Sequence, residues 1–237
     1  MEASDRYIRE HSSGQTEALA WIERQTNIRT NHARMLSGAV QGRFLTMLTE
    51  MIRPARVLEI GTFTGYSAVC IAYGLPENGH LDTLEINDEL EDLILEGFDR
   101  AGVSGKVSLL IGDAKKTLEQ LKADLTGTGT RVQPDETPSI PENCSQPSGN
   151  GLYDMVYIDA NKREYPEYYD LIFNMVRPGG YILADNVLWD GKVWLDPLPK
   201  DRQTQGIAAF NSIVANDPRV ESVILPVRDG LNLIRKK

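Results

Sequence analysis

The chain has 237 residues, of which 41% are hydrophobic, and 34 acidic against 25 basic side chains give it a formal net charge of −9. This length and composition allow one sizeable core, so we predict a single domain over residues 1–237. The acidic balance, without a run of Lys or Arg, argues against nucleic acid and anionic membranes as partners and favours a small-molecule substrate.

The first residues and the two cysteines bear on the compartment. The segment MEASDRYIREHSSG is polar, and no stretch reaches the ~20 apolar residues that a membrane helix needs. Cys70 falls in an apolar helical pattern and Cys144 in a polar linker, which does not suggest a disulfide framework. We therefore predict a soluble cytoplasmic protein.

Residues 1–50 are predicted to form a helical N-terminal segment. From Thr16 to Glu50 the apolar positions recur at helical spacing, and Gly38 and Gly42 are expected to break this stretch into separate helices. We expect the segment to pack over the mouth of a cofactor site or against a second subunit.

Strand and helix patterns then alternate, which predicts an α/β fold with a parallel sheet. The predicted strands are Arg56–Ile60, His80–Ile86, Lys106–Ile111, Tyr153–Ile158 and Tyr181–Ala184, and the predicted helices are Gly65–Tyr73, Asp88–Ala101, Lys115–Leu125 and Tyr165–Met175. Residues 126–151 lose all periodicity and are expected to form a flexible Pro/Gly/Ser-rich insertion. At the end of the chain, VESVILPV and LNLIRKK flank a tight turn, so one strand of this hairpin must be antiparallel.

The segment VLEIGTFTGYS, residues 57–67, places an acid and a glycine turn at the end of a buried strand. Ligands bind at this end of the strands in an open α/β sheet, because the turn lets backbone amides approach closely. A pyrophosphate is disfavoured beside Glu59, whereas a ligand that carries an ammonium and a sulfonium gains from it. The segment therefore favours S-adenosylmethionine over NAD, and the glycines do not match the dinucleotide fingerprint.

Two further strand ends carry groups that suit the same cofactor. Glu85 follows Gly61 at close to the spacing of about 20 residues at which an acid accepts ribose hydroxyls. The third strand ends in Gly112-Asp113-Ala114, which would place a small residue and an acid beside an adenine ring. The glycines are also compatible with a simple tight turn, and Glu85 with a solvated acid at a strand end.

The fourth and fifth predicted strands end in Asp159 and in Asp185-Asn186, and parallel topology would bring these ends to one edge. Two carboxylates and an amide oxygen suit Mg²⁺, whereas zinc would call for His or Cys. The alternative is that Asp159 caps the next helix and Asp185-Asn186 forms a turn, and spacing alone does not decide between them.

Two residues near this edge are candidates for chemistry. Lys162 lies three residues after Asp159, where a divalent cation would lower the lysine pKa and make it a general base; otherwise it is a solvated lysine at a helix start. Trp189 could form an apolar wall for a flat ring, although a lone Trp is more often part of the core. None of the three histidines falls at a predicted strand mouth, which disfavours a His-dependent hydrolase.

As a set, these residues resemble the cation-dependent O-methyltransferases that include the caffeoyl-CoA and catechol enzymes. The resemblance runs from about Met35 to the C-terminus and is carried by MLSGAVQGRFL, VLEIGTFTGYSA, TLEIN, the GDA turn, YDMVYIDANK, RPGGYILADNVLWDGKV, FNSIVANDPRV and LPVRDGL. It implies a Rossmann-like class I methyltransferase fold, with a seven-stranded, mostly parallel sheet, one antiparallel strand and helices on both faces. It also implies a homodimer.

The resemblance also implies roles for individual residues. Mg²⁺, or another divalent cation such as Mn²⁺ or Ca²⁺, would be held by Asp159, Asp185 and Asn186, with Lys162 as the base. S-adenosylmethionine would contact Glu59, Gly61, Ser67, Glu85 and Ala114, and Asp159 would lie near both ligands; we add Phe63 and Asp113 as neighbours in the same turns, and Trp189 and Lys162 as substrate contacts. Many relatives carry an Asp where this chain has Asn161, and the insertion is longer than usual.

The expected reaction is Mg²⁺-dependent transfer of a methyl group to a hydroxyl of a vicinal dihydroxy-aromatic molecule such as a catechol or a caffeoyl compound. Two other classes remain as alternatives. One is an NAD-linked oxidoreductase, suggested by the α/β pattern and opposed by Glu59. The other is a catalytically silent binding protein, opposed by the presence of all the metal and base candidates.

Overall fold

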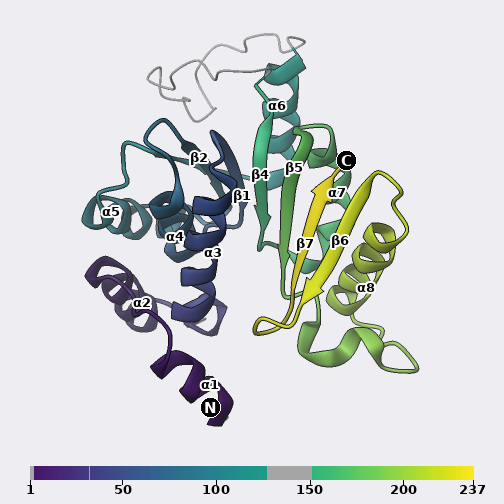
Figure 1. Cartoon of the computed structure of the whole chain (residues 1–237), viewed down its shortest axis with the longest axis horizontal. Coiled ribbons are helices and arrows are strands. Elements are labelled where there is room, and N and C mark those ends of the chain that lie inside the picture. The colour runs from purple at the N-terminus through teal and green to yellow at the C-terminus, as the bar shows by residue number, and fades with distance from the viewer. Residues whose placement is uncertain (1–2, 32, 127–150) are drawn as a thin grey trace.

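The computed structural model describes residues 3–31, 33–126 and 151–237. Within them, seven strands form one sheet in the order β3-β2-β1-β4-β5-β7-β6 (Figure 1). The first five strands pair in parallel, and β7 runs antiparallel to both of its neighbours. The predicted fold class, including the single antiparallel strand, is confirmed. The strands are β1 (Arg56–Ile60), β2 (His80–Glu85), β3 (Val107–Ile111), β4 (Tyr153–Ile158), β5 (Val176–Asp185), β6 (Val220–Leu225) and β7 (Leu231–Lys236).

Helices cover both faces of the sheet (Figure 1). One face packs against α2, α3, α4 and α5, and the other against α6, α7 and α8. Side chains alternate between the two faces along each strand, so Val57 of β1 packs with the first set and Leu58 with the second. The helices are α1 (Ala3–Glu10), α2 (Glu17–Arg29), α3 (Gly38–Ile52), α4 (Tyr66–Gly74), α5 (Glu91–Ala101), α6 (Ala114–Thr126), α7 (Tyr165–Phe173) and α8 (Arg202–Ala215), with short 3-10 turns η1 (Ala33–Met35), η2 (Asp88–Leu90), η3 (Lys162–Glu164) and η4 (Trp189–Trp194).

Only one of the two glycines predicted to break the N-terminal helices does so. Gly38 has a φ of +77° and starts α3. Gly42 lies inside α3, where a Cβ would come within 2.7 Å of the Sγ of Cys70 and 2.9 Å of the Tyr66 ring. The prediction for Gly42 was therefore wrong, because this glycine serves the close packing of α3 against α4.

Two other elements differ from the sequence prediction. Strand β5 begins at Val176 rather than Tyr181, because Val176 already pairs with Tyr153 of β4, and residues 177–180 form an irregularity before the regular register resumes at Tyr181. Helix α8 has no counterpart in the predicted elements. Its Gly206 packs so tightly on the backbone of Lys162 and Arg163 that a Cβ would collide with both residues.

Some predictions fall outside the described residues, namely those for the insertion from 127 to 150 and for Cys144. Cys70 is a buried free thiol in α4, as its apolar pattern predicted. In the described part of the chain, no helix has both the length and the apolar character needed to cross a membrane.

Candidate active site

The carboxyl ends of β1 to β5 meet at one edge of the sheet, and the site is built there. Gly61 directly follows β1, beside the end of β4, with a φ of +99°, and a Cβ on it would collide with the carbonyl oxygen of Asp159. The backbone N–H groups of Gly61 and Thr62 both donate to Leu84 of β2 at 3.0 Å. This position needs glycine for its backbone conformation and for the close approach.

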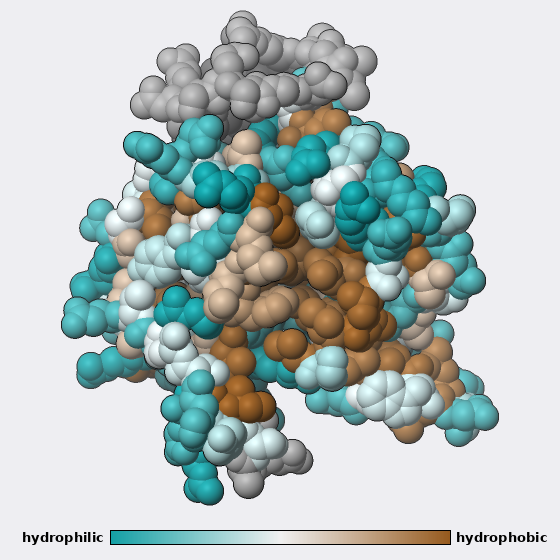
Figure 2. Space-filling view, viewed as in Figure 1, coloured by the Kyte–Doolittle hydropathy of each residue, from teal (hydrophilic) through white to brown (hydrophobic). Residues whose placement is uncertain are grey.

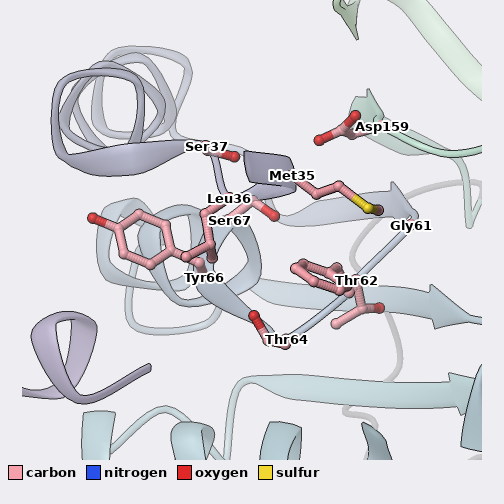
Figure 3. A pocket seen from close by; sticks show the side chains of 10 residues that line it. Met35, Leu36, Ser37, Gly61, Thr62, Thr64, Tyr66, Ser67 and Asp159 are labelled. Atoms are coloured by element: carbon pink, nitrogen blue, oxygen red, sulfur yellow. The ribbon is translucent and has the colours of Figure 1, made fainter. Parts of the chain in front are cut away.

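A small cavity opens between this turn and the start of α3 (Figure 3). In Figure 3 the Met35 side chain reaches from η1 toward Gly61 and the carboxylate of Asp159. The lining includes four predicted site residues, Gly61, Phe63, Ser67 and Asp159, and six that were not predicted, Met35, Leu36, Ser37, Thr62, Thr64 and Tyr66. The N-terminal segment thus covers the mouth of the site, which confirms the first of its two predicted positions.

Hydrogen bonds connect the wall of this cavity to distant parts of the chain. Nη1 of Arg228, in the turn between β6 and β7, donates to the carbonyl oxygen of Leu36 at 2.6 Å. The hydroxyls of Thr26 in α2 and Thr64 in the glycine turn lie 2.8 Å apart in a buried hydrogen bond. The cavity wall therefore depends on contacts from both the first helices and the last hairpin.

Glu59 is fully buried in β1, beneath the glycine turn. The hydroxyl of Thr83 donates to its Oε2 at 2.5 Å, and its Oε1 has no hydrogen-bond partner among the described residues. Burial raises the pKa of Glu59 to about 8 from 4.5. A buried acid with an unmet oxygen suits a cationic ligand, because the added positive charge would stabilise the carboxylate.

The other cofactor candidates occupy the ends of β2 and β3. Glu85 accepts from the backbone N–H of Phe63 at 2.6 Å and of Asn87 at 2.9 Å, so this carboxylate is held in place beside the turn. Asp113 and Ala114 follow β3, where Oδ1 of Asp113 accepts from the N–H of Lys116 at the start of α6. Of these residues, Phe63 alone lines the cavity.

Asp159 and Lys162 are in direct contact at the end of β4. Nζ of Lys162 donates to Oδ1 of Asp159 at 2.6 Å and to the hydroxyl of Tyr165 at 2.7 Å. Lys162 is only 7% exposed, so it is not the solvated lysine of the alternative interpretation. The residue that caps the following turn is Asn161, whose Oδ1 accepts from Arg163, and this leaves Asp159 free of the capping role.

Asp185 and Asn186 lie at the end of β5, next to β4. The buried hydroxyl of Tyr165 is within hydrogen-bond distance of both Ile158 O and Asp185 O, which links the two strand ends. Burial and the negative charge of Asp159 both raise the pKa of Asp185. Oδ1 of Asp185 accepts from the N–H of Asn186, which follows the strand with a left-handed φ of +57°.

These side chains fit a hard divalent cation. Among the residues that the structure describes, no three His, Cys, Asp or Glu side chains are grouped to hold a metal. Asp159 and Asp185 instead offer two neighbouring carboxylates, with Asn186 as an amide donor. Mg²⁺ typically uses one or two carboxylates and fills its other positions with water or substrate oxygens, and a cation would relieve the repulsion between the two acids.

Trp189 follows these residues at the start of η4. Its ring is partly buried against the core under α7 and α8, its Nε1 has no hydrogen-bond partner among the described residues, and Nζ of Lys192 lies 5.7 Å from the ring centre. Trp189 therefore packs against the core with one face of its ring, which is the more common role of a lone Trp.

Sequence reasoning missed two polar residues at the start of α3. Ser37 lines the cavity, and Gln41 donates to Asp185 from a fully buried position. A Ser directly before a helix-starting Gly is a visible signal for Ser37. A polar residue among the apolar positions of α3 is the only signal for Gln41.

Comparisons with known proteins agree with this geometry. A family model described as O-methyltransferase matches residues 9–130 and 131–237. "Caffeoyl-CoA O-methyltransferase 2" of Zea mays is 35% identical over 207 residues, which cover 85% of this chain and 70% of the relative, and "Caffeoyl-CoA O-methyltransferase 1" of Arabidopsis thaliana is 31% identical over 85% and 71%.

Solved structures give the same result. An O-methyltransferase from Bacillus cereus in complex with SAH matches with a TM-score of 0.81 and 27% identity, over 99% of this chain and 97% of that chain. The O-methyltransferase TomG from Streptomyces achromogenes, in complex with SAM, matches with a TM-score of 0.80 and 27% identity over 100% of both chains.

Proposed function

This chain belongs to the O-methyltransferase family and is an S-adenosylmethionine-dependent O-methyltransferase, and from that premise we propose that it methylates a vicinal dihydroxy-aromatic small molecule with the help of a divalent cation, preferably Mg²⁺. The observation that carries the proposal is the partly buried contact between Lys162 and Asp159, one strand away from Asp185. This contact supports the proposal because a candidate base and two candidate cation ligands lie at the same edge of the sheet.

The cofactor would lie over the glycine turn. Gly61 lets the backbone approach, Glu59 offers a buried negative charge to a cationic ligand, and Glu85 is held where it can accept ribose hydroxyls. Ser67 and Asp159 line the cavity next to them. Asp113 and Ala114 would flank the adenine at the end of β3.

Asp159, Asp185 and Asn186 would hold the cation. When bound, S-adenosylmethionine supplies the methyl group, and the cation lowers the pKa of the hydroxyl that accepts it. Lys162, in the neutral form that a nearby cation favours, would remove the proton of that hydroxyl, and Tyr165 keeps the lysine Nζ in place through its own hydroxyl. Most of the rate acceleration would come from holding the acceptor hydroxyl and the methyl group of the cofactor at close distance.

The acceptor class is inferred from the relatives and from the site. The relatives from maize and Arabidopsis carry caffeoyl-CoA in their names, and two adjacent hydroxyls are the arrangement that can ligate one cation with both oxygens. The partly exposed face of Trp189 would pack against the aromatic ring of such a molecule.

We also propose a homodimer that uses the apolar face seen in Figure 2. Met47 and Met51 are 53% and 78% exposed on α3, and Val223 is 50% exposed on β6 beside Leu233. In Figure 1 no described helix lies in front of β5, β7 and β6 on this side. Exposed apolar patches of this kind mark protein contacts, and sedimentation of the wild type against Met51→Glu tests the proposal.

The two alternatives are disfavoured for different reasons. Family membership argues against an NAD-linked oxidoreductase, and a nicotinamide titration without a fluorescence change would remove that option. A catalytically silent binding protein would not need Asp159, Lys162, Asp185 and Asn186 together.

The decisive experiment measures release of S-adenosylhomocysteine with a panel of catechol-bearing phenolics, including caffeic acid and its CoA thioester, with Mg²⁺ and with EDTA. Turnover that EDTA abolishes supports the proposal, and the ranking within the panel defines the acceptor. Turnover that persists in EDTA overturns the role of the cation. Cofactor binding without turnover of any acceptor favours the silent-binder alternative.

A further inference from the structure

Gln41 is a fully buried amide that contacts a proposed cation ligand from a different part of the chain. Its Nε2 donates to Oδ2 of Asp185 at 2.5 Å and to the hydroxyl of Tyr157 at 3.0 Å. The Tyr157 hydroxyl donates to the same Oδ2 at 2.8 Å. Residues of α3, β4 and β5 thus form one buried hydrogen-bond network.

The amide group of Gln41 is only partly satisfied by hydrogen bonds. Its Oε1 is buried and has no hydrogen-bond partner among the described residues. An unmet buried amide oxygen costs about 1–3 kcal/mol, and an apolar side chain of the same length would avoid that cost between α3 and the sheet. What offsets this cost is the pair of hydrogen bonds that the amide donates to Asp185 and Tyr157, so the amide acts on this carboxylate.

The hydrogen bonds define which oxygen of Asp185 remains open. A carboxylate has about four lone-pair sites, two on each oxygen. Gln41 and Tyr157 use the two sites of Oδ2, whereas the N–H of Asn186 uses one site of Oδ1 at 2.8 Å. Oδ1 is left with the free position.

We propose that Gln41, together with Tyr157, is a positioning residue that orients the Asp185 carboxylate so that it ligates the cation through Oδ1 alone. The inference rests on the proposed cation site. Hydrogen-bond partners behind a metal ligand fix its orientation, and their loss typically costs about 10–100-fold in metal affinity. Gln41 also brings α3, whose start lines the cofactor cavity, into contact with the cation site.

The test compares Gln41→Met with the wild type. Methionine keeps the length and removes the donor. Affinity for Mn²⁺ alone is measured from the electron paramagnetic resonance signal of the free ion, and affinity for S-adenosylhomocysteine by calorimetry. We expect Mn²⁺ to bind about 10-fold more weakly or worse, with binding of S-adenosylhomocysteine unchanged.

Thr46→Val is the matched control. Thr46 is buried in the same helix and donates to the carbonyl oxygen of Cys70 at 2.8 Å, away from Asp185. This variant should lose thermal stability and keep the wild-type affinity for Mn²⁺. A loss of Mn²⁺ affinity in Thr46→Val equal to that in Gln41→Met would overturn the inference, because weakening of α3 would then be enough.

Two further outcomes separate this inference from the proposed function. Wild-type protein that does not bind Mn²⁺ refutes the cation site and the positioning role together. Wild-type protein that binds Mn²⁺, with unchanged affinity in Gln41→Met, refutes the positioning role alone. If Gln41→Met does not fold, Tyr157→Phe removes the other donor to Oδ2, and an unchanged affinity in that variant overturns the inference equally.

Discussion

Nζ of Lys162 lies 2.6 Å from Oδ1 of Asp159, and the two side chains are 9% and 19% exposed. Removal of Asp159 would leave the buried lysine charge unpaired, whereas removal of Lys162 would leave a carboxylate that water still reaches. The two residues have different proposed roles, so replacing them one at a time separates binding of the cation from transfer of the proton.

Asp159→Ala removes one proposed cation ligand. We expect release of S-adenosylhomocysteine to fall to the level found in EDTA, because the remaining ligands hold the cation poorly and Lys162 adds an uncompensated positive charge beside it. Asp170→Ala is the control, since it makes the same change in net charge at an exposed position of α7. Full Mg²⁺-dependent activity in Asp159→Ala would remove the cation assignment.

Lys162→Met keeps most of the aliphatic stem and deletes the amine. The expected effect is a loss of roughly 10²–10⁴-fold in kcat, the usual contribution of a general base. Affinity for Mn²⁺ should be retained or increased, because a positive charge next to Asp159 is gone. Single-turnover kinetics and Mn²⁺ titration check both parts, and a kcat close to that of the wild type would exclude the lysine as base.

Glu59→Gln tests the buried acid in β1. Its pKa rises from 4.5 to about 8 on folding, so the folded protein holds a proton that the unfolded chain releases between these values. Stability of the cofactor-free protein therefore decreases as pH rises through this window, by an amount on the order of a few kcal/mol. Gln cannot ionise, so the variant should lack this decrease and bind S-adenosylmethionine more weakly.

Thermal melts at about pH 5.5 and about pH 8.5 measure the difference for Glu59→Gln. Glu50→Gln, at an exposed position of α3, is the matched control for the change in charge. If both variants show the wild-type dependence on pH, the buried carboxyl of Glu59 does not titrate in this window.

Gly61→Ala separates two reasons for glycine in the cofactor turn. The added Cβ would collide with the carbonyl oxygen of Asp159. The alanine would also have to adopt a φ of +99°, which residues with a side chain rarely adopt. We expect a loss of about 2–4 kcal/mol in the free energy of unfolding, from strain and overpacking together. Gly102 has a φ of +67° and open space around it. In urea unfolding, Gly102→Ala should therefore show only the smaller loss in the free energy of unfolding that comes from backbone strain.

Much of the fold could be predicted because the strands carry strong local signals. β1 and β4 have the predicted bounds, since each is a mainly apolar run that ends at a glycine or an acid. The joint position of Asp159 and Asp185 followed from parallel topology, which needs only the order of elements. The glycine turn and the acids around it were visible as a motif.

What could not be predicted depends on contacts between distant residues. Gln41 and Asp185 are 144 positions apart, and no local sequence pattern in α3 indicates that Gln41 contacts Asp185. Gly42 was predicted to break a helix, although the structure uses it for the close packing of α3 against α4. The start of β5 was missed for a similar reason, because Pro178 and the glycines after it signal a turn while tertiary pairing extends the strand.

The bond from Arg228 to the carbonyl of Leu36 joins residues that are 192 positions apart. Chains leave the ribosome from their N-terminus at about 5–20 residues per second. Leu36 and the glycine turn therefore emerge well before the hairpin that fastens them. The cavity wall is complete only after the hairpin of β6 and β7 has been synthesised.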